Sequence, residues 1–364
     1  SVTVYGTYDL GYGATKYENV EGSTSAGSLS QKSAGIVGSP LTSNRFGLRG
    51  TEDLGGGLKA NFNLEFGFAN NLVGDTVTTG SSTSATAAVT APHIQTANGG
   101  GDIQTRTSRV GLESAKLGRL DIGYGLTGLF ATVSGHSPLP GNNWVGDLAY
   151  TSNSISGADE RILAGAVRAS GVQYTSPTIN GVQAVVDYGS GSYKYDNDSA
   201  NGSRVSNAGL TLRYAAGPLA LAATTHQLKT DYVTTSNQIL TTDFTAISAR
   251  YSVTSSLALN ALYATNKTTG VNGTQTGKND VTQVGASYTM GKNVLVAQYG
   301  TGDGKGDNTA AAQRDRKGYQ VGAIHNLSKR TNVYAIYGSQ EEKYISTNVT
   351  EKLSGYAVGV RHSF

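Results

Sequence analysis

The sequence predicts an all-β fold, a closed antiparallel barrel of sixteen strands that crosses a membrane. Three observations predict it. Apolar and polar residues alternate in runs along the 364 residues, which is the pattern of strands with two different faces. Short turns alternate with long polar loops. The last alternating run, Lys352 to Phe364, needs a partner strand, because an unpaired apolar edge promotes aggregation.

Composition agrees with a barrel and excludes other classes. The chain is only 37% hydrophobic but has 21 Tyr and 49 Gly, and it lacks the roughly 20 continuous apolar residues of a membrane helix. A barrel shows lipid every second side chain and places aromatic residues at the interfaces. The absence of Cys fits passage through an oxidising periplasm. Because Ser1 lies inside the first strand pattern, we expect a mature chain whose signal peptide has been removed.

Strands and connectors follow one another in a regular order. Clear alternating runs occupy residues 2–12, 58–68, 208–214, 284–288 and 319–323. Short turns are expected at residues 52–56, 114–117, 178–181, 215–218, 252–256, 291–293 and 328–331. Long loops are expected near residues 15–41, 70–101, 127–163, 192–203, 231–240, 268–279, 302–316 and 343–350. Seven turns and eight loops join sixteen strands.

The whole chain, residues 1–364, is expected to be one barrel domain, because neither a linker nor a change of composition divides it. A soluble β-helix or propeller is the alternative, but such folds repeat a motif at fixed spacing and this chain does not.

Signals for catalysis or metal binding are poor. The five His residues, at 93, 136, 226, 325 and 362, are scattered, and no thiol is present. We therefore expect no enzyme activity, catalytic residue, metal or cofactor. The net charge of +3 with dispersed Lys and Arg gives no indication of nucleic-acid binding.

Three arginines are expected on the inner face of the barrel by strand phase. Arg45 and Arg49 alternate with Phe46 and Leu48, and Arg250 alternates with its apolar neighbours in the same way. An Arg that faces lipid at mid-membrane costs about 2–4 kcal/mol, so these side chains are expected to face water or to lie near a rim of the barrel.

Five segments carry a family resemblance that extends from end to end. They are SVTVYGTYDLGY at 1–12, SNRFGLRGTEDLGGGLKANFNLE at 43–65, TRTSRVGLESAKLGRLDIGYG at 105–125, VRASGVQYTSPTINGVQAVVDYG at 167–189 and GVRHSF at 359–364. The chain resembles the sixteen-stranded general porins of Gram-negative outer membranes, of the betaproteobacterial branch.

The resemblance implies a pore constriction. In the family the third long loop folds into the barrel, which here corresponds to residues 126–164 and contains the single Trp, Trp144. The family's wall arginines match Arg45, Arg106 and Arg168, with Arg49 and Arg250 as lesser contributors. Arg106 shares its parity with two apolar residues of the same strand, and a β-bulge between them would bring it to the inner face.

The chain departs from the family in this loop. Many relatives have Pro-Glu-Phe-Gly-Gly there, with the Glu facing the arginines, whereas this chain reads Ser-Pro-Leu-Pro-Gly-Asn-Asn over 137–143. A further family arginine is replaced by Gly-Tyr-Gly over 123–125. Asp147, Asp159 and Glu160 remain as loop acids, so the wall charge is expected to be less compensated.

The first functional hypothesis is a water-filled channel for passive diffusion of small polar solutes that prefers anions. The alternative on the same scaffold is a channel selective for small anions such as dicarboxylates or phosphate. An outer-membrane enzyme or adhesin anchored by the barrel is a third hypothesis, without a catalytic cluster or oversized loops to favour it. Expected partners are solutes, anions, outer-membrane lipid and lipopolysaccharide, and two further copies in a homotrimer with loop 70–101 near the interface.

Overall fold

A computed structural model describes residues 1–20, 30–68, 103–149, 162–163, 166–194, 202–233, 238–270, 273–306, 313–346 and 348–364. These residues form one helix and seventeen strands: β1 (Val2–Val20), β2 (Ser30–Gly38), β3 (Arg45–Gly55), β4 (Leu58–Phe68), β5 (Ile103–Ser114), β6 (Gly118–Leu126), α1 (Gly128–Gly135), β7 (Arg168–Thr175), β8 (Val182–Lys194), β9 (Gly202–Ala216), β10 (Leu219–Val233), β11 (Gln238–Ser252), β12 (Leu257–Thr269), β13 (Gln275–Met290), β14 (Asn293–Gly306), β15 (Arg314–Asn326), β16 (Thr331–Tyr344) and β17 (Thr350–Ser363).

The strands close into one antiparallel barrel. From β3 to β17 each strand pairs with the next in the chain, and β17 pairs with β1 from Thr7 to Val20 to complete the ring. β2 and β3 both pair with β1, β3 along residues 2–7 and β2 along residues 10–18. They therefore share one barrel position, and the seventeen strands form the predicted barrel of sixteen positions.

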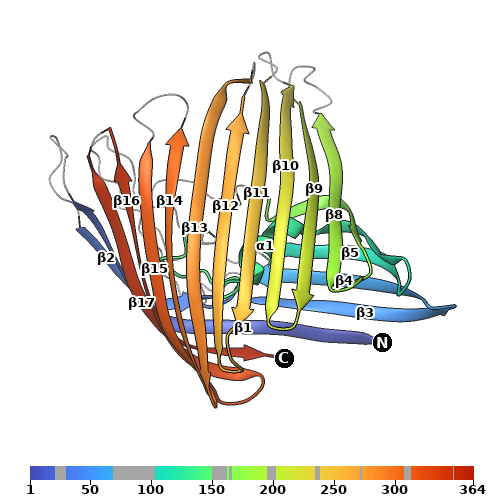
Figure 1. Cartoon of the computed structure of the whole chain (residues 1–364), viewed down its shortest axis with the longest axis horizontal. Coiled ribbons are helices and arrows are strands. Elements are labelled where there is room, and N and C mark those ends of the chain that lie inside the picture. The colour runs from blue at the N-terminus through green and yellow to red at the C-terminus, as the bar shows by residue number, and fades with distance from the viewer. Residues whose placement is uncertain are drawn as a thin grey trace.

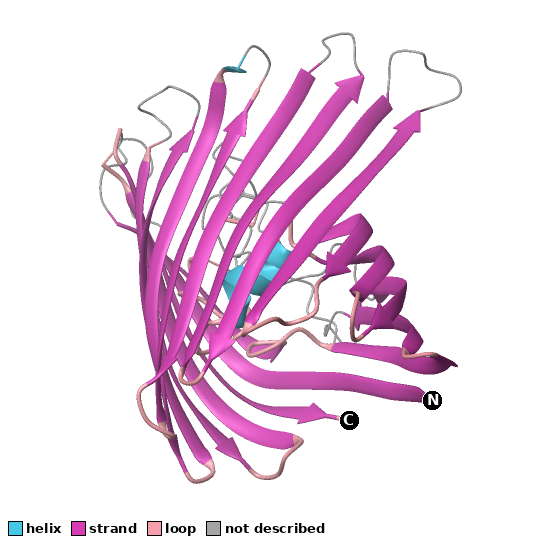
Figure 2. Ribbon diagram, turned by 45° about the vertical axis from the view of Figure 1, so that its right-hand side comes forward, coloured by secondary structure: helices cyan, strands magenta, loops and turns pink. Residues whose placement is uncertain are grey.

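Figure 1 shows the long strands β8 to β17 side by side, with β1, β3, β4 and β5 crossing the other side of the molecule. The two termini lie close together. Figure 2 shows α1 enclosed by the strands and the short turns between strands gathered at one end. Within the described part of the chain, no helix is long and apolar enough to cross a membrane.

All seven predicted short turns are confirmed, but the strands extend further at the opposite end than the sequence indicates. β14 continues to Gly306 and β13 begins at Gln275, inside segments predicted as loops. Backbone pairing needs no apolar side chain, so the ladder continues beyond the region where alternation marks it. The predicted loop 70–101 lies outside the described residues.

The alternation in sequence separates an outer apolar face from an inner polar face. Tyr299, Tyr319 and Val321 are 48%, 41% and 46% exposed on the outside, where lipid would cover them. Between them, Gln298 and Gln320 are buried on the inside. These inner side chains are buried because a loop lies over them.

That loop contains α1, the one described helix, which the strand patterning did not predict. Thr127 caps it, because its hydroxyl accepts from the Phe130 amide at 3.2 Å. The Gly128 amide donates to Asp187 Oδ2 on β8 at 2.8 Å, which places a carboxylate at the positive end of the helix. The cap and the carboxylate fix where the loop enters the barrel.

Candidate functional site

The third long loop lies along the inner side of the barrel, as predicted. α1 packs on β9, β10 and β11, where the Thr132 hydroxyl shares a hydrogen bond of 2.6 Å with Thr224. Past the helix, His136 Nδ1 lies 2.6 Å from Ser248 Oγ on β11, and Ser137 Oγ donates to Gln298 on β14. Described residues of the loop thus follow the wall strand by strand away from β8.

Trp144 anchors the far end of this loop. It is 2% exposed, and its indole Nε1 donates to the Gly355 carbonyl on β17 at 3.0 Å. Gln320 Nε2 donates to the carbonyls of Trp144 and Val145 at 2.7 and 2.9 Å. The anchor works through backbone and side-chain groups together, so the loop is held against β15 and β17.

Asp147 lies in this loop but does not face the water-filled side. Its side chain is buried, and Oδ2 accepts from Asn142 Nδ2 and Gln298 Nε2, each at 3.1 Å. Its Oδ1 accepts from the Ala149 amide at 3.0 Å. These hydrogen bonds direct Asp147, one of the candidate loop acids, toward the wall. Asp159 and Glu160 lie outside the described residues.

The tip of the loop contacts the wall at residues 39–44, the unpaired segment between β2 and β3. Between β2 and β3 the residues 39–44 leave the ladder, and Asp9 Oδ2 accepts from the amides of Leu41 and Thr42 at 2.7 and 2.8 Å. Asn143 Nδ2 donates to the Ser39 carbonyl at 3.1 Å, and its amide donates to the Pro40 carbonyl. The interruption thus forms a platform for the loop tip.

Next to this platform, a group of charged side chains that we call the inner-wall cluster occupies β1, β3, β4 and β5. It consists of Tyr5, Arg45, Arg49, Glu65 and Arg106. Arg106 Nε donates to Glu65 Oε1 at 2.8 Å, and Arg45 Nε lies 3.6 Å from Oε2 of the same carboxylate. The Tyr5 hydroxyl, which donates to Asn63 Oδ1 at 2.8 Å, lies 3.1 Å from Glu65 Oε2. Two of the predicted arginines are thus brought together around an acid that the sequence did not single out.

A β-bulge brings Arg106 to the inner face. The pairing of β4 with β5 shifts register between Glu65, opposite Thr107, and Phe66, opposite Thr105, so that Arg106 has no partner in the ladder. Gly67 provides the space, since a Cβ there would lie 2.8 Å from Arg106 Cδ. The bulge expected from the conflicting parity is confirmed.

Arg49 lies on the inner face four positions along β3 from Arg45. Its guanidinium carbon lies 4.9 Å from the centre of the Tyr5 ring, a cation–π arrangement. The phase predicted for Arg45 and Arg49 is confirmed, because Phe46 and Leu48 are exposed on the outer side.

Sequence reasoning missed Arg109. This side chain crosses β6 to reach β7, where Nη1 donates to Gln173 Oε1 at 2.7 Å, and Nη2 donates to the Leu126 carbonyl at 3.1 Å. Gly125 makes the crossing possible, since a Cβ there would lie 2.5 Å from Arg109 Nε. The Gly-Tyr-Gly segment that replaces the family arginine could have given this signal, because small residues beside an inward Arg leave room for it.

Arg168 begins β7 opposite Leu126. It shares its phase with Val172 and Tyr174, which are exposed on the outer face, whereas Gln173 faces inward to Arg109. Strand register therefore does not support the expectation that Arg168 joins the inner-wall cluster, and Arg109 is the inward arginine of this region.

Arg250 lies on the inner face of β11, in phase with buried Ser248, as predicted. It belongs to the part of the wall that the loop covers, near His136 rather than near Glu65. Burial, and then the nearby positive charges of Arg250 and Arg213, lower the pKa of His136 below its ordinary value. His136 is therefore neutral at neutral pH.

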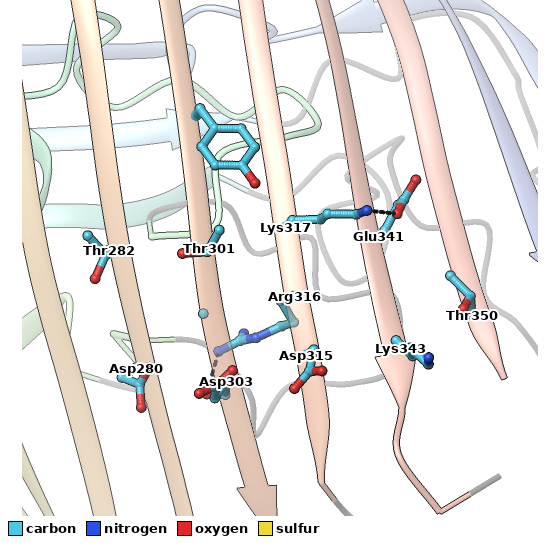
Figure 3. A pocket seen from close by; sticks show the side chains of 12 residues that line it. Asp280, Thr282, Thr301, Asp303, Asp315, Arg316, Lys317, Glu341, Lys343 and Thr350 are labelled. Carbon is cyan, nitrogen blue, oxygen red and sulfur yellow. Dashed lines mark hydrogen bonds and ion pairs between the residues drawn. The ribbon is translucent and has the colours of Figure 1, made fainter. Parts of the chain in front are cut away.

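The outer face carries a hollow of about 480 Å³ near the loop end of β13 to β17, shown in Figure 3. Asp280, Asp303 and Asp315 are directly opposite one another on three neighbouring strands. Lys317 Nζ lies 2.8 Å from Glu341 Oε2 at its side. Because the exposed Tyr299 and Tyr319 lie further from the loop end on the same strands, this charged surface is at the height of the lipid headgroups.

The described residues contain no group of three His, Asp or Glu side chains placed to hold a metal ion. The geometry instead combines an enclosed barrel, a loop along the inner wall and an arginine-rich surface that described loop residues leave uncovered.

Comparison with known proteins decides the family. The family model for Gram-negative porins matches residues 1–344. The chain belongs to the Gram-negative porin family. It is an outer-membrane protein, and the family is one of channels. The family interpretation made from the five sequence segments is thus confirmed.

Relatives of this porin agree with that placement. It is 27% identical over 241 residues to an outer membrane porin protein of Bordetella pertussis; the match covers 63% of this chain and 54% of that relative. The chain thus spans about half the length of this curated relative.

Three solved structures share the fold. An anion-selective porin from Comamonas acidovorans has a TM-score of 0.70 at 22% identity, with 100% of this chain and 99% of that chain covered. The trimer form of OmpT from Vibrio cholerae has a TM-score of 0.63 at 14% identity, covering 100% and 99%. The channel DcaP of Acinetobacter baumannii has a TM-score of 0.63 at 15% identity, covering 100% and 98%.

Proposed function

We propose that this porin is a single-domain, water-filled channel through which small polar solutes and ions diffuse passively, with a preference for anions. The observation that carries the proposal is the charge of the inner wall on β3, β4 and β5. Arg45, Arg49 and Arg106 lie there around the carboxylate of Glu65, and Arg109 lies beside them with Asp121 and Asp187 nearby. The porin from Comamonas acidovorans, whose fold this chain shares, is described as anion-selective. That description agrees with the charge of this wall.

The magnitude is sufficient for selectivity. One unit charge about 5 Å from a passing ion in well-hydrated surroundings contributes on the order of 0.8 kcal/mol. Glu65 offsets one of Arg45, Arg49 and Arg106, so this group keeps a net positive charge that attracts anions. The buried Asp147 does not oppose it, because its oxygens are occupied inside the wall.

The test is the reversal potential of the protein in a planar bilayer under a KCl gradient. We expect anion preference, and we expect it to fall in the double variant Arg45→Gln, Arg106→Gln. Arg168→Gln is the matched control, with a smaller expected shift, because its strand phase is that of the outer face. Cation preference in the unmodified channel, or an unchanged potential in the double variant, contradicts the proposal.

We also propose a homotrimer that buries the outer face of β3 to β6. These strands have 11, 11, 12 and 9 residues, whereas β9, β10 and β11 have 15 each. Phe46 lies 5.5 Å from Phe66 and 6.2 Å from Phe68 between ring centres on this face. Short strands with clustered phenylalanines on their outer face fit contact with a neighbouring protein better than contact with lipid. A trimer form of OmpT from Vibrio cholerae, which shares the fold, agrees with this assembly.

Outer-membrane lipid and lipopolysaccharide are the proposed partners of the charged hollow in Figure 3. Lys317 and Lys343 offer cations at headgroup height, where phosphate groups of lipopolysaccharide would lie. The double variant Lys317→Gln, Lys343→Gln should retain less lipopolysaccharide after purification than the unmodified protein. Equal retention would contradict this partner for the hollow.

A further inference from the structure

A cavity lies at the short-turn end of the inner-wall cluster, around its member Arg49. Thr3, Arg49 and Asn63 are directly opposite one another on β1, β3 and β4. They line a cavity of about 270 Å³. Four residues of strand separate Arg49 from Arg45, about 13 Å at a rise of 3.3 Å per residue. The cavity is therefore a step beyond the narrow part of the channel.

Arg49 differs from Arg45, Arg106 and Arg119 in its partners. Arg45 and Arg106 both have Glu65 within ion-pair distance, and Arg119 forms two bonds of 2.8 Å with Asp121. No described carboxylate lies within ion-pair distance of Arg49, whose side chain is exposed to the cavity and stacked on Tyr5. Its guanidinium edges thus remain available to an anion.

The surroundings hold this guanidinium in one place and add further donors. Tyr5 Oη donates to Asn63 Oδ1 at 2.8 Å, and the same hydroxyl lies 3.1 Å from Glu65 Oε2, so the ring beneath Arg49 is fixed from two sides. Because Asn63 accepts through Oδ1, its amide nitrogen keeps its donors for a ligand, and the Thr3 hydroxyl lies on the other side of Arg49.

We propose that Arg49, Asn63 and Thr3 form a binding subsite for the carboxylate group of a small organic acid. The proposal rests on the channel function and adds a ligand class to it. A planar guanidinium edge matches a planar carboxylate in two parallel hydrogen bonds, which a spherical chloride ion cannot use. The subsite therefore distinguishes carboxylates from chloride, beyond the general attraction of anions by the wall.

Acetate is the probe. Chloride conductance of the intact protein in a planar bilayer is measured while acetate is added from the short-turn side. We expect a saturable decrease in conductance. Arg49→Gln should raise the half-blocking acetate concentration about tenfold or more, and Asn63→Ala should raise it severalfold, as charged hydrogen bonds are lost. Arg330→Gln, on an exposed short turn, removes the same charge outside the channel and should leave it within about twofold.

Arg49→Lys separates geometry from charge. Lysine keeps the positive charge but loses the planar fork, so the half-blocking concentration should rise severalfold while the reversal potential in KCl stays nearly constant. The β-sheet spectrum of each variant confirms that the barrel has folded.

The result that overturns the subsite is an unchanged acetate block in both Arg49→Gln and Asn63→Ala, or a block in Arg49→Lys equal to that of the unmodified channel. Failure of the channel proposal has a different signature, since it appears in the unmodified protein as cation preference in KCl alone. Acetate block that depends on Arg49 supports the subsite in either case.

Discussion

Glu65 occupies the centre of the inner-wall cluster, where it compensates Arg45 and Arg106 and positions Tyr5. Its carboxylate lies between Arg45 and Arg106 and is within ion-pair distance of both. At the scale of single residues, the proposed anion preference would depend on this balance rather than on the number of arginines.

Glu65→Gln should therefore increase anion preference. Loss of one negative charge about 5 Å from a passing ion lowers the energy of an anion and raises that of a cation by about 0.8 kcal/mol each, so the anion-to-cation permeability ratio should rise roughly fifteenfold. Reversal potentials in a KCl gradient measure this ratio. Glu341→Gln, which removes a carboxylate from the outer face, is the control. A decrease in anion preference in Glu65→Gln would show that Glu65 does not compensate the arginines.

His136 gives the loop a dependence on pH. Its lowered pKa means that the folded protein holds it neutral, chiefly because it is buried and then because Arg250 and Arg213 are near. The unfolded chain binds the proton more readily, so the stabilising contribution is complete above about pH 6.5 and is lost as pH falls through the folded pKa. Protonation adds a third positive charge to this part of the wall.

We expect the open-channel current of the unmodified protein to become noisier as pH falls below about 6, as the loop loosens at His136. His136→Asn retains a hydrogen-bonding side chain for Ser248 without a titratable ring, and its noise should be nearly independent of pH between 7 and about 5. Equal pH dependence in the two proteins would assign the effect to another group.

At the scale of elements, the loop with α1 is fastened to the wall at its two ends. Asp187 holds the first turn of the helix, and Trp144 holds the far end against β17. Between them, Leu129 and Val133 share a buried apolar cluster with Phe244 of β11, and Leu139 shares another with Val296 of β14. Hydrogen bonds and apolar packing together hold the loop on the wall.

Trp144→Ala should release the far anchor. Loss of a buried Trp side chain costs about 3–5 kcal/mol, and the barrel ladder itself is untouched. We expect single-channel conductance to rise and anion preference to fall, because the loop no longer confines ions beside the arginines. Trp144→Phe keeps most of the packing and removes one hydrogen bond, so its change should be smaller. A conductance unchanged by Trp144→Ala would mean that the loop does not limit the pore.

Sequence patterns were sufficient for the elements whose residues alternate regularly. The turns, the closure of β1 with β17 and the bulge at Arg106 could all be predicted. Each depends on where the alternation of apolar and polar residues along a strand continues, shifts or stops. α1 could not, because its eight residues have no apolar stripe and its position is set by Asp187 on another strand.

The charged site was predicted in part for a similar reason. Strand phase placed Arg45 and Arg49 inside, but it cannot show which acid an arginine reaches, so Glu65 and the crossing of Arg109 over Gly125 were missed. It also cannot show that Asp147 turns toward the wall, since that depends on Gln298 from a distant strand.

At the scale of the whole molecule, the barrel has two unlike sides. Long strands with exposed tyrosines form one side, and short strands with clustered phenylalanines form the other. The uncovered arginines lie on the inside of the short side. The proposed trimer would thus place each basic wall next to the axis of the assembly.

Phe46→Ala combined with Leu48→Ala should lower the temperature at which the trimer separates into monomers, by removing apolar contacts at its centre. Gel mobility after graded heating in mild detergent measures this temperature. Val284→Ala combined with Leu295→Ala, on the outer face of β13 and β14, removes similar apolar area from the lipid-facing side. Equal shifts in the two double variants would argue against the proposed interface.

The interruption at residues 39–44 separates two properties that a barrel usually couples. The number of strands and their stagger set the bore of a barrel, whereas the proposed constriction here rests on a loop tip that contacts the unpaired segment 39–44 through Asn143. Substitutions in that segment can widen or narrow the passage while every ladder bond of the scaffold stays in place. Permeability in this protein can therefore diversify at a few side chains, independently of the architecture that inserts into the membrane.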